Sequence, residues 1–487
     1  MERLASGKMA CPDHPTAPPT ITVEPSSGIV CVFKFTCSYC GVLVESNKMS
    51  EKDANNRFTL NTQLAFGTIL AGGHRSTAET IAVHLGLPPP VTLSEWAKDM
   101  EYLREVTSKV ADRSMYQAAE EAVEAVNDTD ITVSCDGTWQ RRGFSSKNGV
   151  ATVITHSKDK PGKVIDVEVM SSYCFTCSRY DDDAPKHNCT KNHQGTAGSM
   201  ETTGMVRIFC RSLEKRGTRY LNYLGDGDSK AFSAVKDAMP YGPDTTIEKL
   251  ECVGHVQKRM GTMLLSKVEQ CKGKEFSWRG RKHRGIGGLG KLNKSTIMAI
   301  QVQYGIAIRN NIGDLEGMKR CIWAIWHHKN KNHSDCGTSC PAVNGTGDGN
   351  ANSLPIFVLN EIKPVFETLS EKSLLKKCLH GGTQNNNESF HKIIWSYCSK
   401  NQFVQRCRLE LAVNCAVVHF NDGVTNLSSV YNYLNISVGQ QLAKHLYGKD
   451  FLRVGSAQKL LGKEGNGRRK RKISSKPDNQ DYQAGAF

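Results

Sequence analysis

The stretch GGTQNNNESFHKIIWSY, residues 381–397, places one carboxylate at the start of an amphipathic helix. Apolar residues recur there at i, i+3, i+4 and i+7, which predicts one buried face. That face consists of Phe390, Ile393, Ile394 and Tyr397. Glu388 falls in the first turn, behind three asparagines that could cap the helix. Because Asn385-x-x-Glu388 also fits a capping box, Glu388 could instead serve only the helix start.

Two further acids end apolar runs far upstream in the chain. Asp136 follows ITVSC, and Asp226 follows YLNYLG. Each alone has an ordinary explanation, as a turn residue at a strand end or a cap of the next helix. Together with Glu388 they could converge instead, and two-metal phosphoryl chemistry requires such hard oxygen ligands. Asp228 is the alternative second acid, and we favour Asp226 because it directly follows the strand.

The size and charge of the chain limit the classes of protein to which it can belong. It has 487 residues, enough for two or three domains, and a net charge of +15. This charge favours nucleic acid as the partner, although a basic protein without such a ligand fits charge alone equally well. There is neither a secretory signal nor an uninterrupted apolar run of membrane-spanning length, so we expect an intracellular protein. In that reducing environment we expect Cys210, Cys407 and Cys415 to be buried and clustered cysteines to bind metal.

The periodicity predicts an α/β fold with one mixed sheet. Residues 1–57 should contain a disordered start and a short Cys-containing module, and residues 58–128 a helical module. Residues 129–256 alternate as three meander strands, a helix, a strand, a helix and the strand EKLECVGH. Completed by a late helix within 376–424, this is the ribonuclease-H-like order.

The segment 257–375 is too long for a loop, so we expect an inserted, mostly helical domain with a strongly basic start. The residues expected to contact DNA phosphates are Lys258, Arg259, Arg279, Arg281 and Lys282. The tail, 425–487, should be polar, basic and partly disordered. Its RRKRK run at 468–472 fits a nuclear signal, and equally the solvated end of a disordered tail.

Two Cys/His groups have the composition of tetrahedral zinc sites, with unpaired thiols as the alternative. The first is expected to use Cys174, Cys177, Cys189 and His193, with His187 as a substitute ligand. The second would use His328, His333, Cys336 and Cys340. Cys37 and Cys40 form half of another site, and its second half could be Cys11 with His14, or Cys31.

Four blocks in order resemble the Mutator-like transposase domain. They are DGTWQRRGFSS, YLGDGDSKAF, LECVGHVQKRMG and TQNNNESFHKIIW. The resemblance extends from about Cys37 to about Asn421. It implies a DDE catalytic core that binds Mg2+ or Mn2+ through Asp136, Asp226 and Glu388.

The resemblance also implies a C-x2-H pair after the fifth strand, which Cys252 and His255 match. His255 could order the active site or contact DNA phosphate, and a plain core histidine is the alternative.

The implied function is a nuclear, metal-dependent DNA transposase that cuts and transfers strands. Its partners would be transposon ends and target DNA, bound by a homo-oligomer. The main alternative is a domesticated, catalytically silent DNA-binding protein with the same fold. A zinc-stabilised protein-interaction module is a third hypothesis, which the charge of +15 disfavours.

Overall fold

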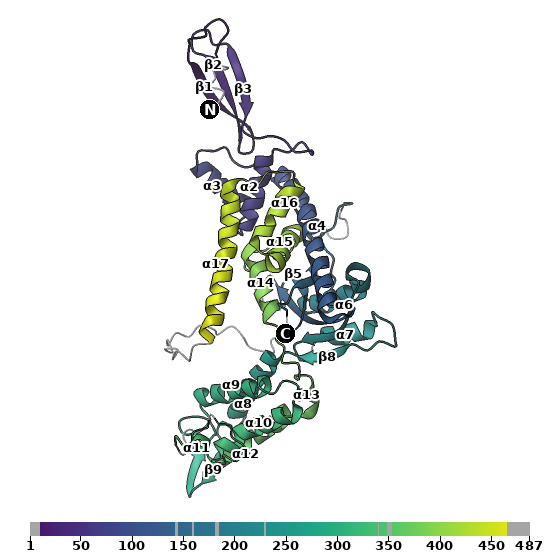
Figure 1. Ribbon diagram of the computed structural model, residues 1–487, viewed down its shortest axis with the longest axis vertical. Helices are drawn as coiled ribbons and strands as arrows, with labels where there is room; N and C mark the ends of the chain where they lie inside the picture. Colours follow the sequence, from purple (N-terminus) through teal and green to yellow (C-terminus); the bar gives the residue numbers. More distant parts are fainter. Residues whose placement is uncertain are drawn as a thin grey trace.

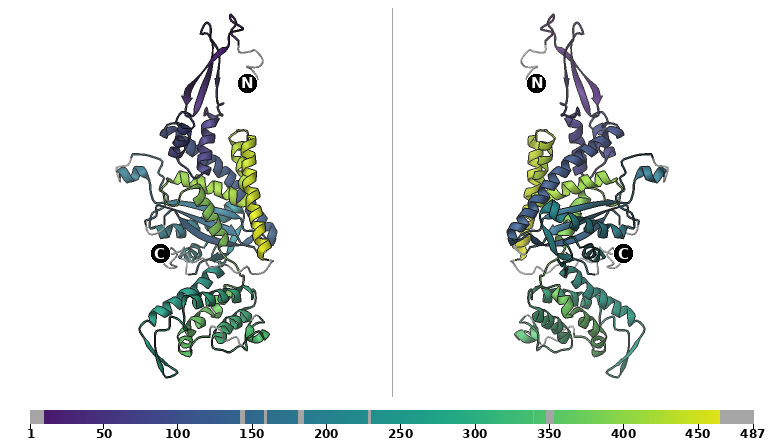
Figure 2. Two further views of the ribbon diagram at one scale, coloured as in Figure 1. Left: turned by 90° about the vertical axis from the view of Figure 1, so that its left-hand side faces the viewer. Right: turned by 90° about the vertical axis from the view of Figure 1, so that its right-hand side faces the viewer.

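A computed structural model describes residues 10–141, 145–157, 160–180, 185–227, 230–338, 340–347 and 353–464. The molecule is elongated, with a central α/β body, a small β-sheet module at one end and a helical region at the other (Figure 1, Figure 2). Across these ranges, no helix combines the length and the apolar character needed to cross a membrane.

The central sheet has the strand order β6-β5-β4-β7-β8. Its strands are β4 (Asp130–Trp139), β5 (Asn148–Thr155), β6 (Val164–Ser171), β7 (Arg219–Gly225) and β8 (Glu248–Glu251). The first three form an antiparallel meander, and β7 and β8 continue the sheet in parallel to β4. Parallel neighbours require crossovers, which α6 (Ala197–Arg216) and α7 (Lys230–Ala238) provide. The five-stranded mixed sheet expected from the periodicity is therefore confirmed.

Two local expectations in this region are wrong. The fifth strand ends at Glu251, because Cys252 is already the N-cap of α8 (Val253–Gln270) and the chain turns into that helix. Cys210 is exposed, since its neighbours Ile208 and Phe209 are the α6 residues that face the sheet. Cys415 is buried as expected, and Cys407 is half-buried.

Strand β5 is buried on both faces and separates two hydrophobic clusters. Val150 and Ile154 contact the cluster of the N-terminal and C-terminal helices, whereas Ala151 and Val153 contact the cluster of α6 and α7. This alternation follows from the two-residue period of a strand. The helices on the first side are α2 (Thr59–Leu70), α3 (Arg75–His84), α4 (Leu93–Val126), α14 (Asn385–Tyr397), α15 (Arg406–Asp422), α16 (Ser428–Tyr433) and α17 (Gln440–Glu464), with the 3-10 helix η2 (Val424–Leu427).

The segment from about residue 425, expected as a polar tail, instead contains η2, α16 and α17, the last of which ends at Glu464. Leu427, Val430 and Leu446 are buried there against the helical cluster, which accounts for the order. The RRKRK run lies outside the described residues.

The N-terminal module is a three-stranded antiparallel sheet in the order β1-β2-β3. The strands are β1 (Pro19–Ser27), β2 (Val30–Cys37) and β3 (Leu43–Lys48). The Cys-containing module is thus longer than the sequence indicates, because β1 pairs with β2 along its whole length.

The region between α8 and α14 has its own hydrophobic cluster. This helical region begins with α8. It continues with β9 (Glu275–Trp278), β10 (Arg281–Arg284), α9 (Lys294–Arg309), α10 (Leu315–Lys329), α11 (Pro341–Asn344), α12 (Ile356–Leu369) and α13 (Lys372–Lys376). Strands β9 and β10 form a hairpin, which the sequence did not predict.

Two buried amide side chains fix the start of α14 to the central sheet. Gln384, the N-cap residue, donates from Nε2 to the carbonyl oxygen of Cys135 (2.7 Å). Asn387 is fully buried; its Oδ1 accepts the Ser134 hydroxyl (2.6 Å), and its Nδ2 donates to Thr152 Oγ1 (3.2 Å). The N-cap has no side-chain cap bond, so the capping-box interpretation of Glu388 is wrong.

Replacing Asn387 by alanine should therefore destabilise the protein by about 1–3 kcal/mol, because buried polar groups of β4 and β5 lose their partner. The free energy of urea unfolding measures the effect. Asn385→Ala, at an exposed position of the same helical turn, serves as the control and should change stability little. Equal losses in both variants would contradict the anchoring role.

Candidate functional site

The first two acids lie at the same level on neighbouring strands. Asp226 directly follows β7, as expected, whereas Asp136 lies within β4, which continues to Trp139 instead of ending there. In the parallel β4–β7 ladder Ser134 pairs with Leu224. Asp136 and Asp226 each lie two residues further along their chains, so both come from the same edge of the sheet. Glu388 lies in the first turn of α14, and the anchoring of that helix on β4 brings it to the same edge.

Asp136 lies among other carboxylates. Its Oδ1 accepts the Gly137 N–H (2.9 Å). Burial raises the pKa of Asp136 well above its usual range, and repulsion from Glu201, Glu388 and Asp226 adds to the rise. The negative charges of Asp226 and Glu388 thus both act on Asp136.

Among the described residues, His391 is the one Lys, Arg or His side chain within 4 Å of the Asp136 carboxylate, and its Nδ1 lies 3.7 Å away. Burial lowers the pKa of His391 to about 3, so this imidazole is neutral at pH 7. The His391 Nε2 is 3.0 Å from Thr152 Oγ1. In the part of the chain that the structure describes, no Lys or Arg side chain lies within 4 Å of this carboxylate, and its oxygen atoms suit a divalent cation.

Asp226 is in the opposite electrostatic situation. The His255 Nδ1 lies 3.2 Å from its Oδ2, and the Arg259 Nη2 lies 3.6 Å from its Oδ1. The hydrogen bond from His255, first, and the charges of His255 and Arg259 hold the pKa of Asp226 far below its usual range. Asp226 is therefore ionised at neutral pH. Of the roles considered for His255, the geometry favours ordering of the second acid.

Cys252 supports the junction of two helices. It is buried at the N-cap of α8, and its Sγ accepts the backbone N–H of Gln384 (3.4 Å). Asp228, the alternative second acid, lies outside the described residues.

A fourth carboxylate was missed by the sequence analysis. Glu201, near the start of α6, packs on the backbone beside Asp136, since a Cβ on Gly137 would come within 2.9 Å of its Cγ. Burial raises the pKa of Glu201 to about 7; Lys249 opposes the rise and Asp226 adds to it. In sequence, an acid near a helix start looks like ordinary dipole stabilisation, so only the crossing of α6 over β4 shows its place.

Asp136, Asp226 and Glu388 do not form a group of three ligands with atoms within 4.8 Å of one another, so the close convergence expected of them is not present in the described chain. Ligand atoms within 4.8 Å of one another are recorded for three groups, and all three consist of Cys and His.

The first Cys/His group sits around α5 (Phe175–Tyr180), between β6 and α6. Its members are Cys174, Cys177, His187 and Cys189. The structure thus replaces the expected ligand His193 by the substitute His187. His193 is buried, and its Nε2 lies 3.0 Å from the Ser199 hydroxyl, so its ring belongs to the start of α6.

The second group lies between α10 and α11 and brings together all four residues that the sequence proposed. They are His328, His333, Cys336 and Cys340. The Nδ1 of His328 is 3.4 Å from the Cys336 Sγ and 3.6 Å from the Cys340 Sγ.

Both groups have the dimensions of a tetrahedral zinc site. With Zn–S of about 2.3 Å and Zn–N of about 2.0–2.1 Å, the edges between ligand atoms should be about 3.5–3.8 Å. The Cys177 and Cys189 sulfurs are 3.5 Å apart, and the Cys340 Sγ is 3.5 Å from His333 Nδ1. Such spacings are much longer than a disulfide of about 2.0 Å. The side chains present therefore fit Zn2+.

The family model of the Mutator-like transposase matches residues 4–340 of the chain. The aligned segment covers more than half of the chain and includes both Cys/His groups, Asp136 and Asp226, while Glu388 lies beyond it. No curated protein matches the chain.

The choice between the two histidines can be tested by metal analysis of the purified protein. His187→Asn should remove one zinc equivalent per chain, because it deletes a ligand of the first group. His193→Asn should keep the full zinc content, since this ring bonds a serine instead. Loss of zinc in the second variant alone would reverse the assignment.

Proposed function

The chain belongs to the Mutator-like transposase family, and from this premise we propose that it is a metal-dependent DNA transposase of the DDE type. The observation that carries the proposal is the common level of Asp136 and Asp226 on two parallel strands, with Glu388 electrostatically coupled to Asp136. A ligand set drawn from two strands and one helix is suited to strand cleavage and transfer.

The proposal includes a ribonuclease-H-like core. A meander of three strands extended by two parallel strands, with α14 packed against β4 and β5, supports it. In such a core, anchoring by Gln384 and Asn387 would set the position of Glu388.

Asp136, Asp226 and Glu388 would hold two Mg2+ or Mn2+ ions, which would activate the attacking water or 3′-hydroxyl and stabilise the leaving oxygen. His255 and Arg259 keep Asp226 in its anionic form. Glu201 adds negative potential beside Asp136 and so favours a divalent cation there.

The proposed DNA contacts lie on the β9–β10 hairpin, at the end of the helical region farthest from the N-terminal module (Figure 1). Arg279, Arg281 and Lys282 are exposed there. The Arg279 guanidinium lies over the Trp278 ring, 4.7 Å from its centroid, and Lys282 makes an exposed ion pair with Glu275 (3.3 Å). Exposed contacts of this kind contribute little to stability, so Arg279 and Lys282 can exchange them for contacts with DNA phosphates.

Lys258 and Arg259, the other residues expected to contact phosphate, lie near the start of α8. Lys258 is exposed. Arg259 instead donates to Glu251 (2.8 Å) beside Asp226, so we assign it to ordering the acids.

The alternative is a domesticated protein that binds DNA without cutting it. The acids, with their ordering partners, favour retained catalysis. A nuclear location and a homo-oligomer on DNA are further parts of the proposal.

Asp136→Asn, Asp226→Asn and Glu388→Gln should each abolish cleavage of terminal-repeat DNA with Mg2+ or Mn2+ while sparing DNA binding, because each removes a metal ligand and no phosphate contact. Glu120→Gln, the same type of change at an exposed site on α4, should cleave normally. If the unmutated protein bound the DNA but did not cut it, the silent alternative would replace the proposal.

Replacing Arg279, Arg281 and Lys282 together by glutamine should weaken binding to any DNA sequence. The slope of log affinity against log salt should fall by up to about 3, because fewer counterions are released. Binding titrations at several salt concentrations measure both quantities.

The comparison is with Lys98, Lys109 and Arg113 replaced by glutamine, which removes the same charge from the exposed side of α4. This variant should bind like the unmutated protein. Weaker binding in it, with the hairpin variant unaffected, would place the DNA contacts on the N-terminal helices.

A further inference from the structure

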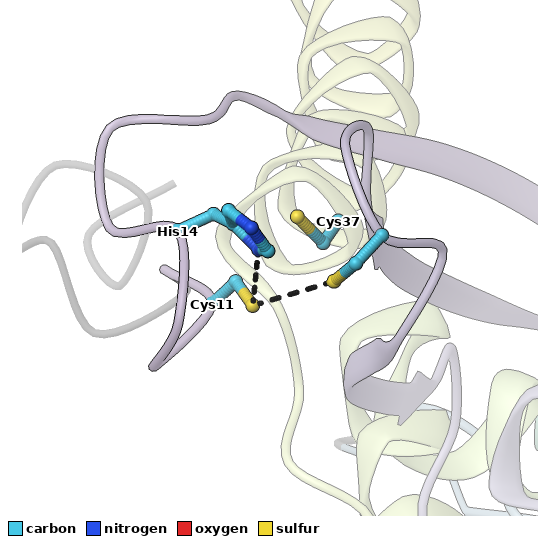
Figure 3. Close-up of side chains that lie close together, drawn as sticks. Cys11, His14 and Cys37 are labelled. Atoms are coloured by element: carbon cyan, nitrogen blue, oxygen red, sulfur yellow. Dashed lines mark hydrogen bonds between the residues drawn. The ribbon is translucent and has the colours of Figure 1, made fainter.

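A third Cys/His group lies at one end of the N-terminal sheet, outside the acid site and both groups above. Its members are Cys11, His14, Cys37 and Cys40, with all ligand atoms within 4.8 Å of one another. Figure 3 shows Cys11, His14 and Cys37 side by side, from the segment before β1 and from the end of β2. Sequence spacing alone left the second half of this group open between Cys11 with His14 and Cys31.

We propose that these four side chains bind a structural zinc ion, the third of the chain. The Cys11 Sγ is 3.7 Å from the Cys40 Sγ and 3.7 Å from the His14 Nδ1. These distances match the edges of about 3.5–3.8 Å expected of a tetrahedral zinc site. Three thiolates and one imidazole form a closed ligand set, as in structural sites, and Zn2+ replaces the three thiol protons on binding.

The backbone shapes both ligand pairs as tight turns. Around C-x2-C, the Gly41 N–H donates to the Cys37 carbonyl oxygen (2.9 Å), and Gly41 has a φ of +71°, which favours glycine. Around C-x2-H, the His14 N–H donates to the Cys11 carbonyl oxygen (3.2 Å). Each turn presents two ligands on one side, so two separated chain segments complete one site.

Cys31 is excluded by its position. It lies near the opposite end of β2, where its Sγ faces the Ile29 carbonyl oxygen (3.9 Å). In the β1–β2 ladder Cys37 pairs with Pro19, whereas Cys31 pairs with Pro25 near the hairpin turn.

The two ends of this sheet are held in different ways. At the turn end, Asn61 of α2 donates to the Ser27 carbonyl oxygen (3.0 Å) and accepts the Ile29 N–H (3.2 Å). The other end has few buried side chains, Cys11, Phe35 and Cys37 among them. So small an apolar core stabilises little, and a metal supplies the missing cohesion.

The experiment counts zinc in the full chain purified under reducing conditions. The unmutated protein should contain three equivalents per chain, and Cys40→Ser and Cys11→Ser should each contain two. Cys31→Ser, the matched thiol control, should keep three. An unchanged zinc content in both ligand variants, or a Cys11–Cys40 disulfide without zinc at this site, would overturn the proposal.

Hydrogen exchange distinguishes a local effect from misfolding. In Cys40→Ser, exchange should rise in residues 10–19 and 36–43, while the β1–β2 turn and the central sheet stay protected. The two remaining zinc equivalents report independently that the rest of the chain is folded. Unaltered protection at the metal end would also contradict the proposal, because the ion would then hold nothing together.

Discussion

Gln384 and Asn387 bind the first turn of α14 to β4 and β5, and the position of Glu388 follows from these buried contacts. Glu388 itself is exposed, and the N-cap of its helix makes no side-chain cap bond. The sheet fixes two acids by register, but the third comes from a helix more than 150 residues after the second acid in sequence. Without the amide anchors, three carboxylates that repel one another would lack a reason to share one edge.

The sequence predicted the regular elements well because each leaves a periodic trace. The apolar residues of β4 to β6 and of α14 recur at the spacing of a strand or a helix, because each element buries its own side chains at that spacing. The fifth strand is shorter than expected because α8 begins at Val253, directly after its N-cap Cys252, and the apolar pattern of the sequence does not mark this start. In the tail, scattered residues such as Leu446 become buried only through contact with distant helices.

The candidate sites also include residues that the sequence identifies and residues that only the three-dimensional structure identifies. Asp136 and Asp226 could be selected because each follows an apolar run, whereas Glu201 could not, since its proximity to Gly137 depends on how α6 crosses the sheet. The choice of His187 over His193 depends on the path of a loop that has no periodicity. Arg259 looked like a phosphate contact among many cations, and only the three-dimensional arrangement places it between Asp226 and Glu251.

The shared cluster of α2–α4 with α14–α17 has a consequence during synthesis on the ribosome. The N-terminal helices emerge early, yet much of their apolar partner surface comes from residues beyond about 385. Closing contacts over such a separation is slow and late. A nascent or prematurely terminated chain would hold Asp136 and Asp226 without α14. The full set of acids therefore assembles only in a chain that has been translated past α14.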